Sequence, residues 1–384
     1  MSSLLSQCKS HDISTLNSSL ESITKSTECI MSSLFFNIDG NYTNFDHFSV
    51  ILKSINHKFS AIGLAETNTD PETASTFVLP GYTSFYQKTR KNKRSGTGVA
   101  LYISKELNAT VVDDLSMCTT DIESIVIKVT NLDRPIYYGA VYRPNDGNIN
   151  LFYEKLRELF KSLPKTGSYI MGDYNIDLLK SVPNTEYEEC LYTSGFSPLI
   201  SIPTHIKPYC KSSCIDNIHT NEPETVLSSG TLTNRISHHL PVYQINSSKS
   251  TPKEAKQKTT QHYDYSFKNV TRFADELKPE LLKLAPSVNF SEFSNLFHSL
   301  LDKHCKLSKP KNTKRTPSNN PWISNGLIKS CQKKHEMMDE WTKTISDESP
   351  DGDPSLREKF TTYRRILKSQ IKKSKSFIYE GKIW

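Results

Sequence analysis

The chain has 384 residues, of which 36% are hydrophobic and 23% are charged, and its formal net charge is +7. No apolar run approaches the roughly 20 residues of a membrane helix, and the Ser-rich N-terminus lacks the apolar core of a secretory signal. The charge is uneven, because residues 1–248 hold 21 Lys and Arg against 25 Asp and Glu, whereas residues 249–384 hold 27 against 16. The basic part fits a polyanion partner and a solvated helical extension equally well.

A weakly ordered leader is expected at residues 1–30, and strand and helix patterns alternate after it. The predicted strands cover residues 34–38, 59–66, 98–104, 122–129, 136–142, 168–173 and 234–245. Helical spacing of apolar residues predicts helices at residues 44–55, 152–163 and 185–194. These elements predict a mixed α/β domain over residues 31–247.

Residues 248–384 are predicted to be a polar linker followed by a basic helical extension. The stretch 246–262 is polar and has no hydrophobic periodicity, which is typical of a linker. Helical patterns follow at residues 269–284, 290–305, 322–345 and 355–380.

The stretch YIMGDYNID, residues 169–177, joins an apolar strand to an acid and an amide at alternate positions. In a strand, residues two apart point to the same side, so Asp173 and Asn175 would project together from the strand end. Gly, Asp and Asn are also common turn residues, and this stretch alone does not separate a turn from a site.

Polar residues close or flank the other predicted strands in the same way. They are Asn37, Glu66, Tyr142 with Asn145, Asp216, and Ser237 with His238 and His239. Each one alone fits a turn or a solvated side chain. Their repetition along the chain favours a site at the ends of the strands.

The order of these motifs resembles the endonuclease/exonuclease/phosphatase superfamily, which has the deoxyribonuclease-I-like fold. FSAIGLAET, GAVYRPN, MGDYNIDLL, PTHI and IDNIHTN are similar to the apurinic-type endonuclease of non-LTR retrotransposons, and the tail segment NNPWISNGLIKS is similar to the region before their reverse transcriptase. The resemblance implies a four-layered α/β sandwich, in which helices flank two packed mixed sheets, followed by a helical extension. No polymerase-like segment follows in this sequence.

The resemblance implies metal-dependent nicking of duplex DNA that leaves a 3′-hydroxyl and a 5′-phosphate; in the family, that hydroxyl primes reverse transcription. Mg²⁺ prefers oxygen ligands, and Glu66 would be its main ligand, with Asn37 close by. Asp173 would deprotonate the attacking water, and Asn175 would bind that water or the phosphate.

The remaining residues of the expected site would bind the phosphate. His239, oriented by Asp216, would donate to the phosphate or to the developing oxyanion, and Tyr142 would be a neutral donor. The further phosphate contacts expected are Asn145, Thr204 and Ser237.

The last motif of the family usually reads Ser-Asp-His, but here it reads Ser237-His238-His239. His238 removes a negative charge, so metal affinity falls, or else the imidazole favours Mn²⁺ over Mg²⁺. We expect a weakened but real nuclease. The alternatives are an impaired nucleic-acid-binding module that keeps the fold and, with less support, a lipid phosphodiesterase.

Two basic stretches suggest contacts outside this site. The loop at residues 90–94 fits a DNA backbone contact and a solvated hairpin equally well. The run KPKNTKR, residues 309–315, is compatible with a nuclear address, and eight scattered cysteines without a CxxC pair indicate a reducing compartment. We expect an intracellular, nuclear protein that binds duplex DNA, with RNA or DNA on its basic extension.

Overall fold

A computed structural model of the chain describes residues 8–27, 29–40, 42–69, 77–87, 96–180, 184–207, 211–248, 262–263, 267–283, 290–305, 307–308, 323–345, 349 and 351–380. The chain forms two compact units, Met1–Lys253 with Ser318–Trp384, and Glu254–Pro317. No helix within the described ranges has the length and apolarity that crossing a bilayer requires. Both expected basic stretches, residues 90–94 and 309–315, lie outside the described residues.

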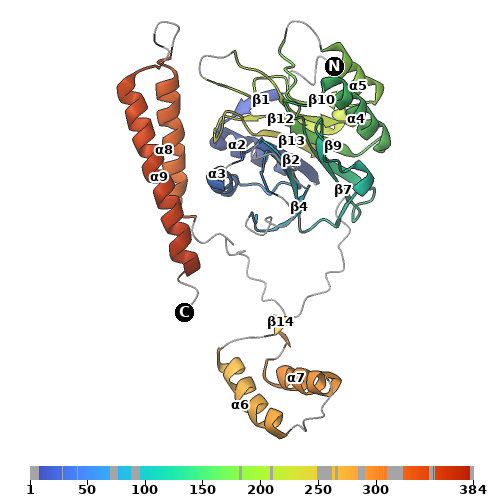
Figure 1. Cartoon of the computed structure of the whole chain (residues 1–384), viewed down its shortest axis with the longest axis vertical. Coiled ribbons are helices and arrows are strands. Elements are labelled where there is room, and N and C mark those ends of the chain that lie inside the picture. The colour runs from blue at the N-terminus through green and yellow to red at the C-terminus, as the bar shows by residue number, and fades with distance from the viewer. Residues whose placement is uncertain are drawn as a thin grey trace. The chain divides into compact units, whose positions relative to one another are not determined.

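The larger unit contains two mixed sheets (Figure 1). The first sheet has the order β1 (Cys8–His11), β12 (Val226–Leu232), β13 (Val242–Ser247), β2 (Ile30–Asn37), β3 (Ala61–Ala65), β5 (Val99–Ser104) and β4 (Tyr82–Tyr86). The second has the order β10 (Ser197–Pro198), β11 (Asp216–Thr220), β9 (Ser168–Asp173), β8 (Ile136–Tyr142), β7 (Glu123–Val129) and β6 (Ala109–Val111). Short 3₁₀ turns lie at η2 (Asp113–Leu115) and η3 (Pro223–Thr225).

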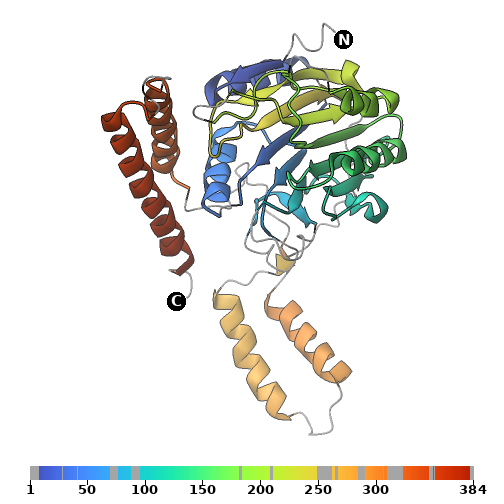
Figure 2. The ribbon, with the colours of Figure 1, turned by 45° about the horizontal axis from the view of Figure 1, so that its top comes forward.

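Helices cover the outer faces of the two packed sheets, as Figure 2 shows. Helices α2 (Ile13–Ser26) and α3 (Tyr42–Ser54) share an apolar cluster with the first sheet, and α4 (Ile149–Ser162) and α5 (Thr185–Thr193) share one with the second. In β2, Phe35 packs between the sheets whereas Leu34 and Phe36 pack under the helices. A strand buried on both faces reads as a continuous apolar run, which is why its pattern was visible in the sequence. The predicted four-layered α/β sandwich is confirmed.

The first residues differ from the weakly ordered leader that the sequence suggested. β1 pairs in parallel with β12, and α2 buries Leu16 and Leu20 against the first sheet. Asp12 caps α2, because its carboxylate accepts from the backbone N–H of Thr15 at 2.7 Å. The solvent-facing side of α2 is rich in serine, and this composition is why the sequence suggested a weakly ordered segment instead of an amphipathic helix.

The C-terminal extension is divided between the two units. Helices α6 (Phe267–Lys283) and α7 (Phe290–His304) form the smaller unit with β14 (His262–Tyr263) and β15 (Leu307–Ser308), and the rings of Phe273 and Phe297 meet edge to face at 5.2 Å. Helices α8 (Asn325–Thr342) and α9 (Pro354–Glu380) belong to the larger unit. The four helices were predicted from the sequence, but this division of the extension was not.

Candidate active site

Strand ends from both sheets meet at one edge of the sandwich. Asp173 ends β9 and lies opposite Tyr142 at the end of β8 and opposite Asp216 at the start of β11. In the other sheet, Asn37 ends β2, and Glu66 follows the neighbouring parallel strand β3. Gly172 allows β8 and β9 to pair closely, since a Cβ there would lie 2.3 Å from the carbonyl oxygen of Val141. The two sheets thus place these predicted residues together.

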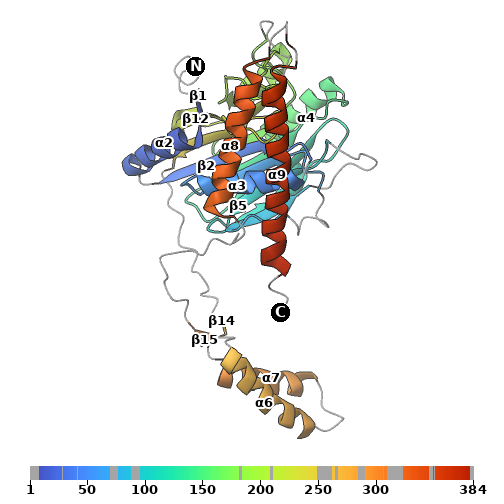
Figure 3. The same cartoon turned by 90° about the vertical axis from the view of Figure 1, so that its left-hand side faces the viewer.

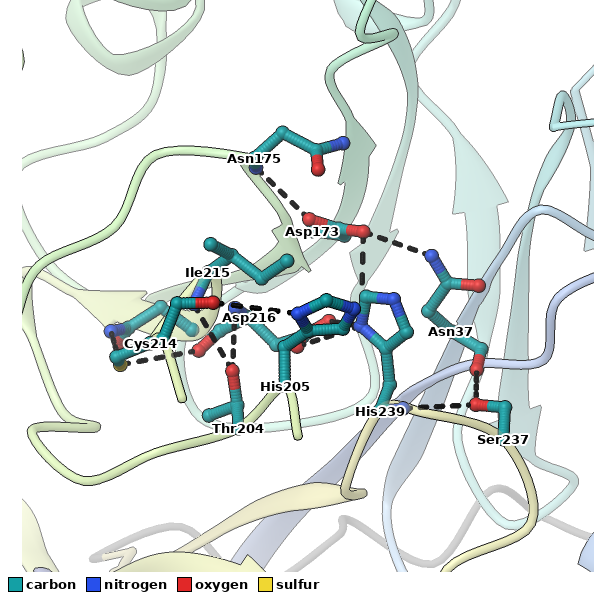
Figure 4. Close-up of polar contacts among 12 residues, drawn as sticks. Asn37, Asp173, Asn175, Thr204, His205, Cys214, Ile215, Asp216, Ser237 and His239 are labelled. Carbon is teal, nitrogen blue, oxygen red and sulfur yellow. Dashed lines mark hydrogen bonds and ion pairs between the residues drawn. The ribbon is translucent and has the colours of Figure 1, made fainter. Parts of the chain in front are cut away.

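The amide of Asn37 joins two of the carboxylates. Its Nδ2 donates to Asp173 Oδ2 at 2.9 Å (Figure 4). The same Nδ2 donates to Glu66 Oε1, also at 2.9 Å. Its Oδ1 accepts from the backbone N–H of Asp39 at 2.9 Å, which fixes which end of the amide faces the acids. A nitrogen donor cannot bind a cation, so this geometry assigns Asn37 a bridging position and leaves Glu66 as the metal ligand expected there.

Among the residues that line the site, Glu66, Asn175 and Asp39 have left-handed backbone conformations, with φ of +52° for Asp39. Glu66 has φ +50° and Asn175 has φ +50°, although neither is glycine. Such a conformation costs an L-residue roughly 1–2 kcal/mol and persists where the surroundings impose it. The reversed backbone at Glu66 turns the chain at the end of β3, beside Asn37.

Asn175 does not project beside Asp173 as the strand periodicity suggested, because β9 ends at Asp173. Its backbone N–H donates to Asp173 Oδ1 at 2.9 Å (Figure 4). Its side-chain Nδ2 donates to the carbonyl of Arg143 at 2.8 Å. Arg143 is buried, and its guanidinium donates to the carbonyls of Tyr174 at 2.8 Å and Asn175 at 2.9 Å. Arg143 was missed in the sequence, although it stands in the YRPN motif, and it clamps the turn behind Asp173.

His239 and Asp216 form the expected pair. His239 Nδ1 lies 2.9 Å from Asp216 Oδ2 and 3.9 Å from Asp173 Oδ2, with Asp216 fully buried. Burial alone would lower the pKa of His239, but the Asp216 carboxylate and then Asp173 raise it above the usual range. The imidazole is therefore held protonated, with Nδ1 turned to Asp216.

Asp173 is the most perturbed acid of the site. Only 1% of its surface is exposed, and burial, followed by the Asp216 carboxylate, raises its pKa above the usual range, against the opposing effect of His239. A raised pKa makes a carboxylate a stronger base, which is the property that removal of a proton from water requires.

Thr204 and Ser237 connect backbone segments rather than face the cavity. Thr204 Oγ1 accepts from the backbone N–H groups of Ile215 and Asp216 at 3.1 and 3.0 Å. Ser237 Oγ donates to the carbonyl of Asn37 and accepts from the backbone N–H of His239, both at 3.1 Å. Their contacts hold Asp216 and His239 in place, which differs from the phosphate contacts expected of them.

A cavity of about 250 Å³ opens in front of these groups. Its lining residues are Asp39, Glu66, Asn145, Asp173, Asn175, His205, Lys207, Ile215, His238 and His239. Asn145 is exposed at its edge, and Tyr142 is buried beside Glu66, which is among the groups that raise its pKa after burial. The cavity thus presents carboxylates together with neutral and cationic hydrogen-bond donors to a small ligand or to part of a larger one.

His205 and Lys207 line the cavity but were not selected as candidates in the sequence. The ring of His205 lies 4.6 Å from that of His239, and burial and His239 lower the pKa of His205 to about 4. Lys207 lies exposed two residues later. The motif PTHIK carried both, but only its threonine was selected. His219 lies outside this cavity in the core, with Nε2 3.0 Å from the hydroxyl of Tyr187.

Among the described residues, Asp173, Asp216 and His239 each offer a potential ligand atom, and these atoms lie within 4.8 Å of one another. The donor set is mostly oxygen, which fits a hard divalent cation, and Glu66 adds a further carboxylate at the same cavity. Three acids facing one imidazolium leave an excess of negative charge that a cation would balance.

His238 lies at the edge of this group. It is exposed, and its carbonyl accepts from the backbone N–H of Ile206 at 2.9 Å. Burial and then Lys207 lower the pKa of His238. An acid at this position would have added a fourth carboxylate to the lining, and the histidine does not.

No protein-family model matches the sequence, and no curated protein matches it significantly. The chain is similar in structure to the endonuclease domain of TRAS1, a telomere-specific non-LTR retrotransposon, with 13% identity, 57% of this chain and 99% of that chain covered, and a TM-score of 0.46. It is also similar to the AP endonuclease LMAP of Leishmania major, with 11% identity, 58% of this chain and 89% of that chain covered, and a TM-score of 0.47. For an AP endonuclease of Archaeoglobus fulgidus the identity is 15%, the coverage is 56% of this chain and 99% of that chain, and the TM-score is 0.43. The structural neighbours are thus members of the superfamily that the motifs resembled.

Proposed function

We propose that the chain is a divalent-metal-dependent endonuclease that nicks duplex DNA and leaves a 3′-hydroxyl and a 5′-phosphate. One observation carries the proposal: Asp173, Glu66 and the Asp216–His239 pair converge from two sheets on one cavity, with Asn37 joining the acids. This combination of a strong base, a protonated donor and spare carboxylates suits attack of water on a phosphodiester.

Each side chain has one task in this mechanism. Asp173 takes a proton from the attacking water, and such general-base help is worth about 10²–10⁴-fold in rate. Asp216 keeps His239 protonated, so that the Nε2–H can donate to a phosphate oxygen as negative charge develops. Asn37 holds Asp173 and Glu66 at fixed separation, and Tyr142 and Asn145 offer neutral donors.

Glu66 would hold the cation, with Asp173 beside it. A bound divalent ion neutralises the phosphate and stabilises the leaving oxygen. The Asp173–Asp216–His239 group is a second possible position, but there the short contact between His239 and Asp216 engages both side chains. We favour Glu66, and Mg²⁺ over Mn²⁺, because oxygen donors dominate.

The proposal is tested by nicking of supercoiled plasmid with Mg²⁺ and, separately, with Mn²⁺. Asp173→Asn and Glu66→Gln would be compared with Asp114→Asn, an acid-to-amide change at an exposed position outside the site. We expect open circles from the wild type and Asp114→Asn, and at least about 10²-fold slower nicking by Asp173→Asn. Polymerase extension from the nick without pretreatment would establish a 3′-hydroxyl.

Two outcomes would separate the alternatives. If all the proteins leave the plasmid intact but retard it equally, the chain is a nucleic-acid-binding module that retains the fold. If Asp173→Asn nicks as fast as the wild type, the assigned base is wrong. Titration of Mn²⁺ into Glu66→Gln should show weaker binding than titration into Asp216→Asn. Nuclear location is a separate proposal, which a fluorescent fusion would test.

A further inference from the structure

Helices α8 and α9 form a hairpin that packs on α3 of the sandwich, as Figure 3 shows. Val50 of α3 shares an apolar cluster with Leu327 of α8 and Leu367 of α9. Lys53 donates to the carbonyl of Ile323 at 2.7 Å, and Arg235 pairs with Asp339 at 3.2 Å. The hairpin is therefore joined to the domain by apolar packing and by polar contacts.

A cavity of about 390 Å³, called here the hairpin cavity, lies between this hairpin and the loop that precedes β13. The lining residues that matter here are Arg235, His238, Lys334, Trp341, Phe360 and Arg364. Asp39 and His238 line both this cavity and the active-site cavity, so the two adjoin. A chain-like ligand that leaves the active site past His238 enters the hairpin cavity next.

Lys334 is a buried cation with no counterion in the part of the chain that the structure describes. Its side chain comes from α8, only 5% of the residue is exposed, and it makes no hydrogen bond or ion pair with any described residue. Arg364 of α9 likewise has no such partner, whereas Arg235 and Arg357 are each paired with an aspartate. A buried ammonium without an anion is costly, and an anion bound beside it would remove that cost.

The neighbouring groups confirm that positive charge accumulates here. His47 of α3 is buried, and its Nε2 has no hydrogen-bond partner. Burial, followed by the charges of Lys334, Arg364 and Lys368, lowers its pKa to about 3. Burial also lowers the pKa of Lys334 to about 8, and Arg364 acts in the same direction. Asp39 is the one acid among the described residues that line the cavity.

The two helices that supply these cations also supply aromatic residues to the cavity. The rings of Trp341 and Phe360 are stacked, with centroids 5.7 Å apart, and both line the hairpin cavity. Aromatic faces beside cations are the combination that holds the bases and the backbone of a nucleic-acid strand.

We propose that the hairpin cavity binds a backbone phosphate of the DNA strand next to the phosphate that is cut, with Lys334 and Arg364 as its cationic contacts. The inference rests on the proposed nuclease function for the identity of the strand. It assigns the C-terminal hairpin to the substrate site, because α8 and α9, which lie outside the sandwich, supply both cationic contacts. Asp39 and His238 form the boundary between the two cavities, and the histidine adds no second negative charge there to oppose a phosphate.

The experiment measures binding without turnover, in the Asp173→Asn protein. Fluorescence anisotropy gives the Kd for a short duplex oligonucleotide at increasing KCl. Lys334→Met removes the charge and preserves the apolar stem, and its control is Lys329→Met on an exposed position of the same helix. We expect Lys334→Met to bind about 10-fold more weakly, because a charged hydrogen bond is lost. The slope of log Kd against log salt should fall by about one.

Lys334→Arg, which retains the charge, should bind close to the parent, and Arg364→Gln should weaken binding even if Lys334→Met fails to fold. Equal Kd values for the parent, Lys334→Met and Arg364→Gln would overturn the inference, and so would an equal loss in Lys329→Met. An effect on RNA binding with none on DNA would also overturn it. Plasmid nicking is scored separately, so a chain that binds through Lys334 but does not nick would refute only the nuclease.

Discussion

Replacement of Arg143 by lysine should show how the site is held together. The guanidinium donates to the carbonyls of Tyr174 and Asn175 at 2.8 and 2.9 Å, and 8% of the residue is exposed. A lysine ammonium is a single point of charge and cannot span both carbonyls. The variant therefore loses one charge-assisted bond and leaves one buried carbonyl unpaired, and we expect it to lose about 2–4 kcal/mol of unfolding free energy.

The assay is urea unfolding followed by nicking of plasmid at a temperature where the variant is folded. Displacement of the turn should move Asp173, and an error of about 1 Å in such a group lowers the rate by up to about 10²-fold. Arg157→Lys is the control, because Arg157 is partly exposed and makes no hydrogen bond with a described residue. A loss of stability below about 1 kcal/mol, equal to that of the control, would refute the clamp.

Three further changes test other parts of the structure. Burial lowers the pKa of His219 to about 3 in the folded protein, whereas a histidine in the unfolded chain has a pKa of about 6.5. Between these pH values only the unfolded state binds the proton, so the free energy of unfolding falls as the pH falls. At about pH 5 the loss is about 2 kcal/mol. His219→Gln, which retains a group near Tyr187, should flatten that dependence in urea unfolding, and an unchanged slope would contradict it. Thr204→Val leaves the backbone N–H groups of Ile215 and Asp216 without their acceptor and should lower the free energy of unfolding by about 2–4 kcal/mol. If Thr204 instead bound the phosphate of the substrate, the change would alter KM and leave the midpoint of urea unfolding unchanged. Leu20→Ala should lower the free energy of unfolding by about 2–5 kcal/mol if α2 is part of the core. A change within experimental error would support the weakly ordered leader that the sequence suggested.

The sequence predicted the architecture well where a strand is buried on both faces. β9 was predicted with its observed bounds, Ser168–Asp173, because its apolar run stops at an acid. The segment 234–245 was predicted as one strand, but β13 begins at Val242, and the residues before it form the loop of Ser237 and His239. The apolar residues Ile236 and Leu240 gave this loop the pattern of a strand, but Ile236 packs against the apolar cluster of the first sheet and Leu240 is buried. Periodicity cannot make this distinction, because it reports apolar spacing and not the direction of the chain.

The direction of single side chains was harder to predict than their proximity. Asn175 and Thr204 are near Asp173 and Asp216 as expected, yet the side chains of both bond to backbone groups, although Asn175 also lines the cavity. Their directions depend on where a strand ends and on which N–H or carbonyl is left unpaired, and both follow from tertiary pairing. The docking of α8 on α3 was likewise invisible, since a basic amphipathic helix reads the same whether it is solvated or packed.

The contacts of Asp173 and Asn175 explain why a buried strand ends in an acid that is followed by an amide. Asp173 carries a charge in a buried place, which is tolerated only where donors surround it. One donor is the amide of Asn37 from the other sheet, and another is the backbone N–H of Asn175, which a left-handed turn brings to Oδ1. The Asn175 side chain is then committed to Arg143, which holds that turn. The amide is therefore tied to the acid through the backbone, and a substitution at Asn175 should act on the position of Asp173 before it acts on any ligand.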